Sequence, residues 1–153
     1  MKYLKFFLIS GLIMSSISMN AQIKQSYYFS KILKGNFGEV SEQVKSALKE
    51  QGFGVVTEID MHTILKEKLP DTDIKPYKIM GVCNPAFAYQ TMQIEDNIGL
   101  FLPCKAVIKD IGNGEIEVLL VNPQAMMLIL ENEELNEIAG EVTEKFQTAI
   151  NNL

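Results

Sequence analysis

The dipeptide Asn113-Gly114 restricts the fold of this chain more than any other feature, because it is a strong signal for the turn of a β-hairpin. Residues 115–121 follow it as a predicted strand. Residues 99–109 precede it and are also predicted as a strand, with apolar or small residues at alternate positions: Leu100, Leu102, Cys104, Ala106 and Ile108. Pro103 inside this segment indicates a sheet edge or a bulge. The chain is therefore expected to contain antiparallel strands.

Further strands are predicted at three segments that are rich in aromatic and β-branched residues or alternate in polarity: residues 26–33, 53–59 and 75–83. Helical segments separate them. A helix is predicted between Asn36 and Gly52, and a short one at residues 61–69 with Asp60 as its N-cap. Asn84 and Pro85 are placed to begin a third helix of about ten residues, as N-cap and first helical position.

The C-terminal segment, about residues 132–152, is the most periodic part of the chain. Apolar side chains recur there at helical spacing: Leu135, Ile138, Ala139, Val142, Phe146, Ala149, Ile150 and Leu153. Together the elements predict one α+β domain of two layers, with a mainly antiparallel sheet of about five strands and helices packed on one face. The long C-terminal helix completes that domain. A domain of about 130 residues is long enough to bury a substantial core.

The N-terminus has the layout of a secretory signal peptide. Lys2 and Lys5 precede a nine-residue apolar run, residues 6–14, which is too short to span a membrane, and small or polar residues lead to Ala21. We expect cleavage after Ala21, which leaves residues 22–153 as a single exported domain, periplasmic or secreted. The alternative is an uncleaved N-terminal anchor.

Charge excludes nucleic acid as an expected partner. All fourteen basic residues are lysine, against nineteen acids, so the formal net charge is −5. Removal of residues 1–21 takes away two lysines and no acid, which leaves twelve lysines and a formal charge of −7. Neither this charge nor the lack of arginine suits phosphate recognition.

Two cysteines are the residues that most suggest chemistry. Cys83 immediately precedes the helix predicted to start at Asn84-Pro85, where free backbone N–H groups and the helix dipole favour a thiolate. Cys104 lies on the next predicted strand. If the strands are neighbours, the thiols could form a structural disulfide, stay buried and unpaired, or act as a redox couple or soft-metal ligands. Export favours the disulfide.

His62 is the only histidine, and a surface role competes with a role as a metal ligand beside Cys83 and Cys104. Methionines spread over several elements, among them Met80, are taken as core residues rather than copper ligands. No paired carboxylates or nucleophilic triad are present, so no catalytic residue is assigned. No cofactor is expected, apart from a soft metal ion as the alternative.

Several blocks of the chain resemble the domain-of-unknown-function 302 family. They are Gly52-Phe53, residues 55–60 (VVTEID), residues 80–85 (MGVCNP) with Ala86 and Ala88, residues 98–104 (IGLFLPC), and Asn122-Pro123. Cys-Asn-Pro combined with Leu-Pro-Cys is fairly specific, and the likeness covers about residues 30–128. The resemblance implies a small α+β domain that could form a homodimer, with no established activity. Many relatives lack the second cysteine, so the chain resembles a cysteine-bearing branch in which the fold does not require the thiols.

Two functions remain in view. The first is an exported binding or interaction module for an unknown protein or small molecule, with a disulfide between Cys83 and Cys104. Its pocket or dimer surface would lie around the Cys-Asn-Pro and Leu-Pro-Cys segments, with Asn84, Pro85, Pro103 and Met80 as candidate residues. The alternative is a thiol redox or soft-metal (copper or zinc) protein that uses the two cysteines.

Overall fold

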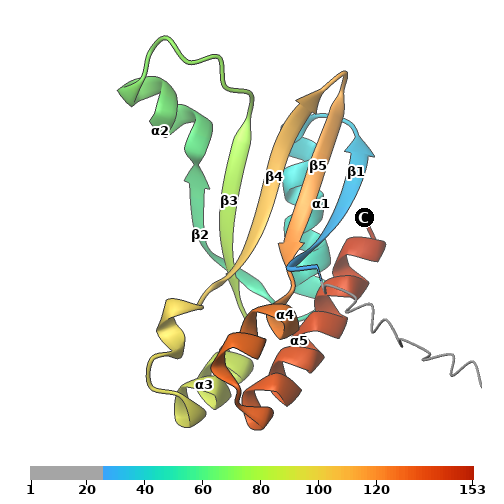
Figure 1. Cartoon of the computed structure of the whole chain (residues 1–153). Helices are drawn as coiled ribbons and strands as arrows, with labels where there is room; N and C mark the ends of the chain where they lie inside the picture. Colours follow the sequence, from blue (N-terminus) through green and yellow to red (C-terminus); the bar gives the residue numbers. More distant parts are fainter. Residues whose placement is uncertain (1–25) are drawn as a thin grey trace, which may run out of the picture.

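The computed structural model describes residues 26–153. The predicted signal peptide, residues 1–21, lies outside these described residues. A five-stranded sheet with the order β1-β5-β4-β3-β2 forms one layer (Figure 1). Its strands are β1 (Tyr28–Lys34), β2 (Gly54–Asp60), β3 (Tyr77–Cys83), β4 (Cys104–Gly112) and β5 (Glu115–Val121). Every neighbouring pair is antiparallel, and β4 and β5 form the hairpin predicted at Asn113-Gly114.

Helices form the second layer. They are α1 (Phe37–Glu50), α2 (Met61–Lys68), α3 (Pro85–Ile94), α4 (Pro123–Met127) and α5 (Glu133–Asn151), with the 3₁₀ turns η1 (Ile98–Leu100) and η2 (Leu128–Leu130). α1 and α5 pack against each other and against the sheet, while α3 and α4 pack on α5 at one end of the molecule (Figure 1). The predicted two-layer α+β fold and its long C-terminal helix are confirmed.

Asparagine begins four of the helices. Asn36 Oδ1 accepts hydrogen bonds from the N–H groups of Gly38 and Glu39, at 2.8 and 3.2 Å, which satisfies donors that a first turn leaves open. Asn84, Asn122 and Asn132 cap α3, α4 and α5 in the same way. Asp60 precedes α2 but makes no side-chain hydrogen bond there, so its predicted capping role is wrong.

The main core lies between the inner face of the sheet and the two long helices. Strand residues that alternate along β3, β4 and β5 are almost fully buried: Met80, Val82, Ala106, Ile108, Ile116, Val118 and Leu120. They pack against Val40, Val44 and Leu48 of α1 and Phe146 of α5. This alternation is the period of two that a half-buried strand shows.

The fourth predicted strand starts too early. The prediction began it at residue 99, but η1 occupies residues 98–100 and β4 begins at Cys104. Leu100, expected on the buried face, is 87% exposed. Pro103 explains the difference, because a residue without an N–H cannot donate to the ladder and the strand starts directly after it.

Asn122 holds the start of the described chain against the helical layer. Its side chain is 2% exposed and donates from Nδ2 to the carbonyl of Ser26 at 2.8 Å. Its Oδ1 accepts from the Ala125 N–H and from the Thr143 hydroxyl, and its own N–H donates to the Tyr27 carbonyl. A single buried asparagine therefore links the residues just before β1 to α4 and α5. In the sequence, Asn122-Pro123 is part of the family resemblance only, and α4 was not predicted.

Candidate functional site

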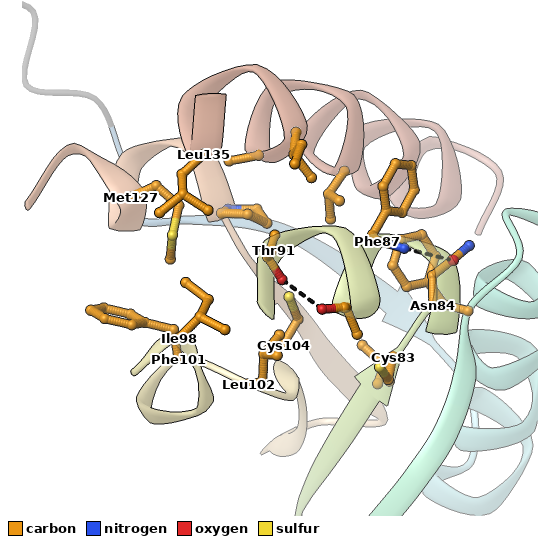
Figure 2. A pocket seen from close by; sticks show the side chains of 17 residues that line it. Cys83, Asn84, Phe87, Thr91, Ile98, Phe101, Leu102, Cys104, Met127 and Leu135 are labelled. Atoms are coloured by element: carbon orange, nitrogen blue, oxygen red, sulfur yellow. Dashed lines mark hydrogen bonds between the residues drawn. The ribbon is translucent and has the colours of Figure 1, made fainter. Parts of the chain in front are cut away.

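An apolar pocket lies at the end of the sheet where β3 finishes and β4 begins (Figure 2). The helices α3, α4 and α5 and the η1 segment close around it, and the cavity measures about 60 Å³. The side chains that shape its walls include Phe87, Thr91, Ile98, Phe101, Leu102 and Leu135. The structure thus brings together segments that are distant along the chain.

Small residues on two helices leave the space that the pocket occupies. Ala88 of α3 and Ala139 of α5 both line it, at positions where a larger apolar side chain would reach into it. Ala139 also belongs to a second buried cluster, with Ile98, Met127 and Leu135, which packs separately from the main core. Leu135 and Ala139 are one helical turn apart, so they present adjacent side chains on one face of α5.

Hydrogen bonds within the walls already engage two polar groups of the pocket, Asn84 Oδ1 and the Thr91 hydroxyl. Asn84 Oδ1 accepts from the N–H groups of Ala86 and Phe87, at 3.0 and 3.4 Å. The Thr91 hydroxyl donates to the Ala88 carbonyl at 3.0 Å (Figure 2). A ligand therefore meets an apolar surface, to which Cys104 adds sulfur.

The predicted disulfide between Cys83 and Cys104 is not formed, and both are free thiols. In the β3–β4 ladder the residue opposite Cys104 is Val82. Successive side chains of a strand point to opposite faces, so Cys83 leaves the sheet on the face away from Cys104. Figure 2 shows Cys104 near Thr91 within the pocket and Cys83 at the end of the β3 ribbon. This placement also disfavours a redox couple between the two.

The predicted lowering of the Cys83 pKa is wrong. Burial raises the pKa of the Cys83 thiol above its ordinary value of 9.0. The first N–H groups of α3, which were expected to favour a thiolate, donate instead to Asn84 Oδ1. Burial, followed by the neighbouring Cys83, raises the pKa of Cys104 to about 11. Both thiols are therefore neutral near pH 7.

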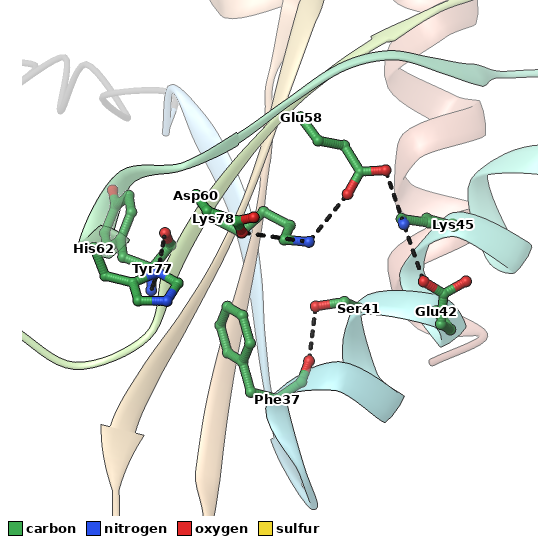
Figure 3. A network of polar contacts seen from close by, with 9 residues as sticks. All are labelled: Phe37, Ser41, Glu42, Lys45, Glu58, Asp60, His62, Tyr77 and Lys78. Atoms are coloured by element: carbon green, nitrogen blue, oxygen red, sulfur yellow. Dashed lines mark hydrogen bonds and ion pairs between the residues drawn. The ribbon is translucent and has the colours of Figure 1, made fainter. Parts of the chain in front are cut away.

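His62 lies at the opposite end of β3 from the cysteines. Its Nδ1 accepts a hydrogen bond from the Tyr77 N–H at 3.2 Å, and its ring packs edge-on against Phe37 of α1, with the ring centres 6.1 Å apart (Figure 3). Tyr77 and Cys83 are six residues apart on one strand, which corresponds to about 20 Å. The structure therefore does not bring His62 to Cys83 or Cys104.

No group of three or more His, Cys, Asp or Glu side chains within residues 26–153 is arranged to hold a metal ion. The charged side chains near β2 pair with one another instead: Lys45 lies 2.8 Å from Glu58, and Lys78 lies 3.0 Å from Glu58 and 3.4 Å from Asp60 (Figure 3). These contacts join α1 to the edge of the sheet. In the same described part of the chain, none of the helices has the length and apolar character needed to cross a membrane.

The family model for the domain of unknown function DUF302 matches residues 29–153. This range contains all five helices and all five strands, apart from the first residue of β1. The chain belongs to the DUF302 family. The match continues through α5, beyond the range of about 30–128 on which the resemblance rested. A search of curated proteins finds no match.

A solved structure has the same DUF302 fold. The crystal structure of an uncharacterized conserved DUF302 protein from Bacillus stearothermophilus is 26% identical in sequence and superposes with a TM-score of 0.77. The alignment covers 84% of this chain and 98% of that one. Nearly the whole of that protein therefore corresponds to the sheet and helices described above.

The four residues proposed for a pocket of this DUF302 domain have different positions. Asn84 lines the cavity. Met80 is fully buried in the main core, Pro85 is exposed in the first turn of α3, and Pro103 packs over Gly81. Much of the wall comes from α3, α5 and η1, three elements that no sequence pattern connected. The sequence signal that could have indicated a pocket is the pair of small residues Ala88 and Ala139, each on an apolar stretch of a helix.

Proposed function

We propose that this DUF302 domain is an exported binding module whose pocket takes an uncharged, slender apolar group such as the end of an alkyl chain. The observation that carries the proposal is the pocket at the end of β3 and β4, whose walls are apolar and whose Asn84 Oδ1 and Thr91 hydroxyl are already hydrogen-bonded. Burial of a charged or strongly polar group without a partner would cost several kcal/mol there, roughly 2–7 even for a neutral polar group.

The cavity volume restricts the ligand further. At about 60 Å³ it is well below the roughly 150 Å³ of an engineered cavity that holds benzene. An aromatic ring would require the walls to move, whereas a chain a few methylene groups long would not. The neutral Cys104 thiol suits such a ligand, because it adds a polarizable contact without charge.

Export is supported by the N-terminal pattern of Lys2 and Lys5, the apolar run at residues 6–14 and the small or polar residues that end at Ala21. The bound compound would then be one that the protein meets outside the cytoplasm. N-terminal sequencing of protein recovered outside the cytoplasm tests this part. A start at Gln22 is expected, and retention of Met1 in the cytoplasmic fraction would refute it.

Binding can be tested with straight-chain alcohols from butanol to octanol, followed by methyl NMR signals of Ile98 and Leu135. We expect affinity to rise about fourfold for each methylene, which corresponds to about 0.8 kcal/mol, until the cavity is full. Ala88→Leu should remove this binding by filling the pocket. Ala86→Leu is the matched control, because Ala86 is exposed on the same helix.

Two results would refute the proposal. One is the absence of chain-length-dependent shifts at Ile98 and Leu135 in the wild type. The other is equal binding by folded Ala88→Leu and Ala86→Leu proteins, because binding would then occur elsewhere on the molecule.

A further inference from the structure

Three segments at the pocket end of the molecule have no charge. Residues 84–94, 97–104 and 122–130 contain no acid, no lysine and no histidine, although 22% of the whole chain is charged. They form α3, the η1 segment up to the start of β4, and α4 with η2. In Figure 1 these elements lie at one end of the molecule, away from α2 and the β4–β5 turn. An uncharged region is thus assembled from three separate stretches of sequence.

Packing joins the three segments. Ile98 of η1 and Met127 of α4 belong to one buried cluster. Ile94 of α3 and Leu130 of η2 pack against the same cluster. Because these residues have a common contact, the exposed residues beside them on each segment lie at the same end of the domain.

Large apolar side chains project from this end. Leu100 is 87% exposed and Ile129 is 75% exposed, the highest values among the large apolar side chains of residues 26–153. Tyr89 on α3 is 66% exposed. We call the whole set the apolar tip: Tyr89, Met92, Leu100, Met126, Leu128 and Ile129. Single exposed apolar residues are normal on a protein surface, but a group of large ones at an uncharged end indicates a docking surface.

Acidic side chains border the three segments. They are Glu95 and Asp96 after α3, Glu131 after η2, and Glu133 and Glu134 at the start of α5. Glu133 and Glu134 line one hollow together with Ile94 of α3, so the start of α5 lies beside that helix. Within residues 26–153 no ion pair occupies these carboxylates. A border of this sign repels anionic surfaces and attracts the ammonium groups of zwitterionic lipids.

We infer that the apolar tip docks on a lipid bilayer with zwitterionic headgroups. Leu100 and Ile129 would enter the boundary between headgroups and acyl chains, as the apolar residues of surface-bound helices do. Tyr89 suits the headgroup level, where tyrosine is enriched. Acyl chains rearrange around side chains that project this far, whereas a protein partner would need a matching cavity for each of them.

The inference rests on the proposed function in one respect, because a bilayer is a source of the alkyl chain ends that suit the pocket. Ile98 connects the two sites, since it lines the pocket and belongs to the cluster that joins the three segments. The sites nevertheless consist of different side chains, because no residue of the apolar tip lines the pocket. Each site can therefore be altered and tested without the other.

Co-sedimentation with phosphatidylcholine vesicles tests the docking surface, with the chain expressed from its complete coding sequence and purified as processed by the cell. We expect half-maximal binding at about 1 mM lipid, about tenfold weaker than binding by a single myristoyl chain. Leu100→Ser combined with Ile129→Ser should weaken binding about tenfold or more, because two large apolar groups are lost without a change in charge. Ile32→Ser combined with Val56→Ser is the matched control, because both residues are more than half exposed on other elements.

Two further measurements use the wild type. Replacement of part of the phosphatidylcholine by anionic phosphatidylglycerol should weaken binding, because the acidic border is repelled. Phosphatidylcholine vesicles should also slow the oxidation of Met92 and Met126 by hydrogen peroxide, while that of Met61 on α2 stays constant.

The inference is overturned by a wild type that does not bind phosphatidylcholine vesicles at about 5 mM lipid. Equal binding by the two double variants also overturns it, since another part of the chain would then be responsible. A second copy of the chain is the alternative occupant. Self-association that Leu100→Ser with Ile129→Ser abolishes, without any vesicle binding, would identify that occupant and refute the lipid surface.

The pocket and the docking surface fail separately. Ala88→Leu, which fills the pocket, should bind vesicles as the wild type does. The double variant at Leu100 and Ile129 should still bind octanol. Vesicle binding without octanol binding in the wild type therefore refutes the pocket alone, and octanol binding without vesicle binding refutes the docking surface alone.

Discussion

Cys104 lies directly across the β3–β4 ladder from Val82, so Cys83, the next residue, points to the other face of the sheet. The two thiols are thus one residue out of register, which prevents the disulfide that the sequence suggested. The same register puts Cys104 among apolar walls, where a thiolate is disfavoured. The chemistry of each sulfur follows from its position on the pleated sheet.

Reduction should leave the stability of the protein unchanged. A disulfide that closed a loop of about 20 residues would contribute about 3 kcal/mol and raise the melting temperature by about 10 °C. Calorimetry with and without a reductant measures this directly, and thiol titration in denaturant should count two free thiols. A fall of about 10 °C on reduction would contradict the free thiols of the structure.

Cys104 should react slowly with alkylating reagents at pH 8. With a pKa of about 11 in place of 9.0, its thiolate fraction is about 100-fold lower than that of an ordinary thiol. In a Cys83→Ser variant, the rate with iodoacetamide should rise about tenfold per pH unit from pH 7 to 9.5. Mass spectrometry follows the reaction, with Cys104→Ser as the control. A rate that becomes constant below pH 9 would show that the pKa of the Cys104 thiol is not raised so strongly.

Gly81→Ala should destabilise the sheet. A Cβ at residue 81 would lie 2.6 Å from Pro103 Cγ and would also collide with Thr57 Oγ1. Because the proline ring is rigid, we expect a loss of about 1–3 kcal/mol in the free energy of unfolding, measured with urea. Gly99→Ala is the control, because a Cβ there meets no atom within 4 Å. Equal stability of the two variants would mean that Pro103 moves away without cost.

Glu58→Gln should reduce stability at neutral pH but not at acidic pH. Hydrogen bonds first from Lys45 and then from Lys78 lower the pKa of Glu58. Its contribution is therefore present above the unfolded pKa, about 4.3, and is lost as the pH falls through the lower folded value. Because the side chain is about one-third exposed, we expect the variant to lose only about 0.5–1 kcal/mol at pH 7.

Urea unfolding at pH 7 and pH 3 checks the Glu58 prediction. Glu141→Gln on the exposed side of α5 is the control and should show little change at either pH. A loss at pH 3 as large as that at pH 7 would indicate that the amide disturbs packing and that charge is not the cause.

Elements with local signals could be predicted from the sequence. β5 has the predicted bounds of residues 115–121, because the Asn113-Gly114 turn determines where it begins. α3 starts at the predicted Pro85, because Asn84 supplies the cap from the adjacent position. The same signal at Asn122-Pro123 begins α4, but that helix has only five residues and no apolar periodicity to reveal it.

The pocket could not be predicted because its walls depend on which helix faces touch. Asn84 and the two cysteines were among the candidates, since they form part of distinctive motifs. Ala88 and Ala139 were not, because an alanine on a helix is common and creates a cavity only when its neighbours are known. The alternating pattern also predicted a fourth strand that is too long. Leu100 fits the pattern, but it lies before Pro103, at which the hydrogen-bonded ladder ends.

The position of β1 at the edge of the sheet has a consequence for how the chain folds. β1 pairs only with β5, so the partner of Tyr28 is Val121, and α5 must then cover the same core. An N-terminal fragment of a growing chain therefore cannot complete either layer. Such long-range pairing makes folding slow compared with that of a helical bundle. The domain therefore stays without its final tertiary structure until α5 has been made.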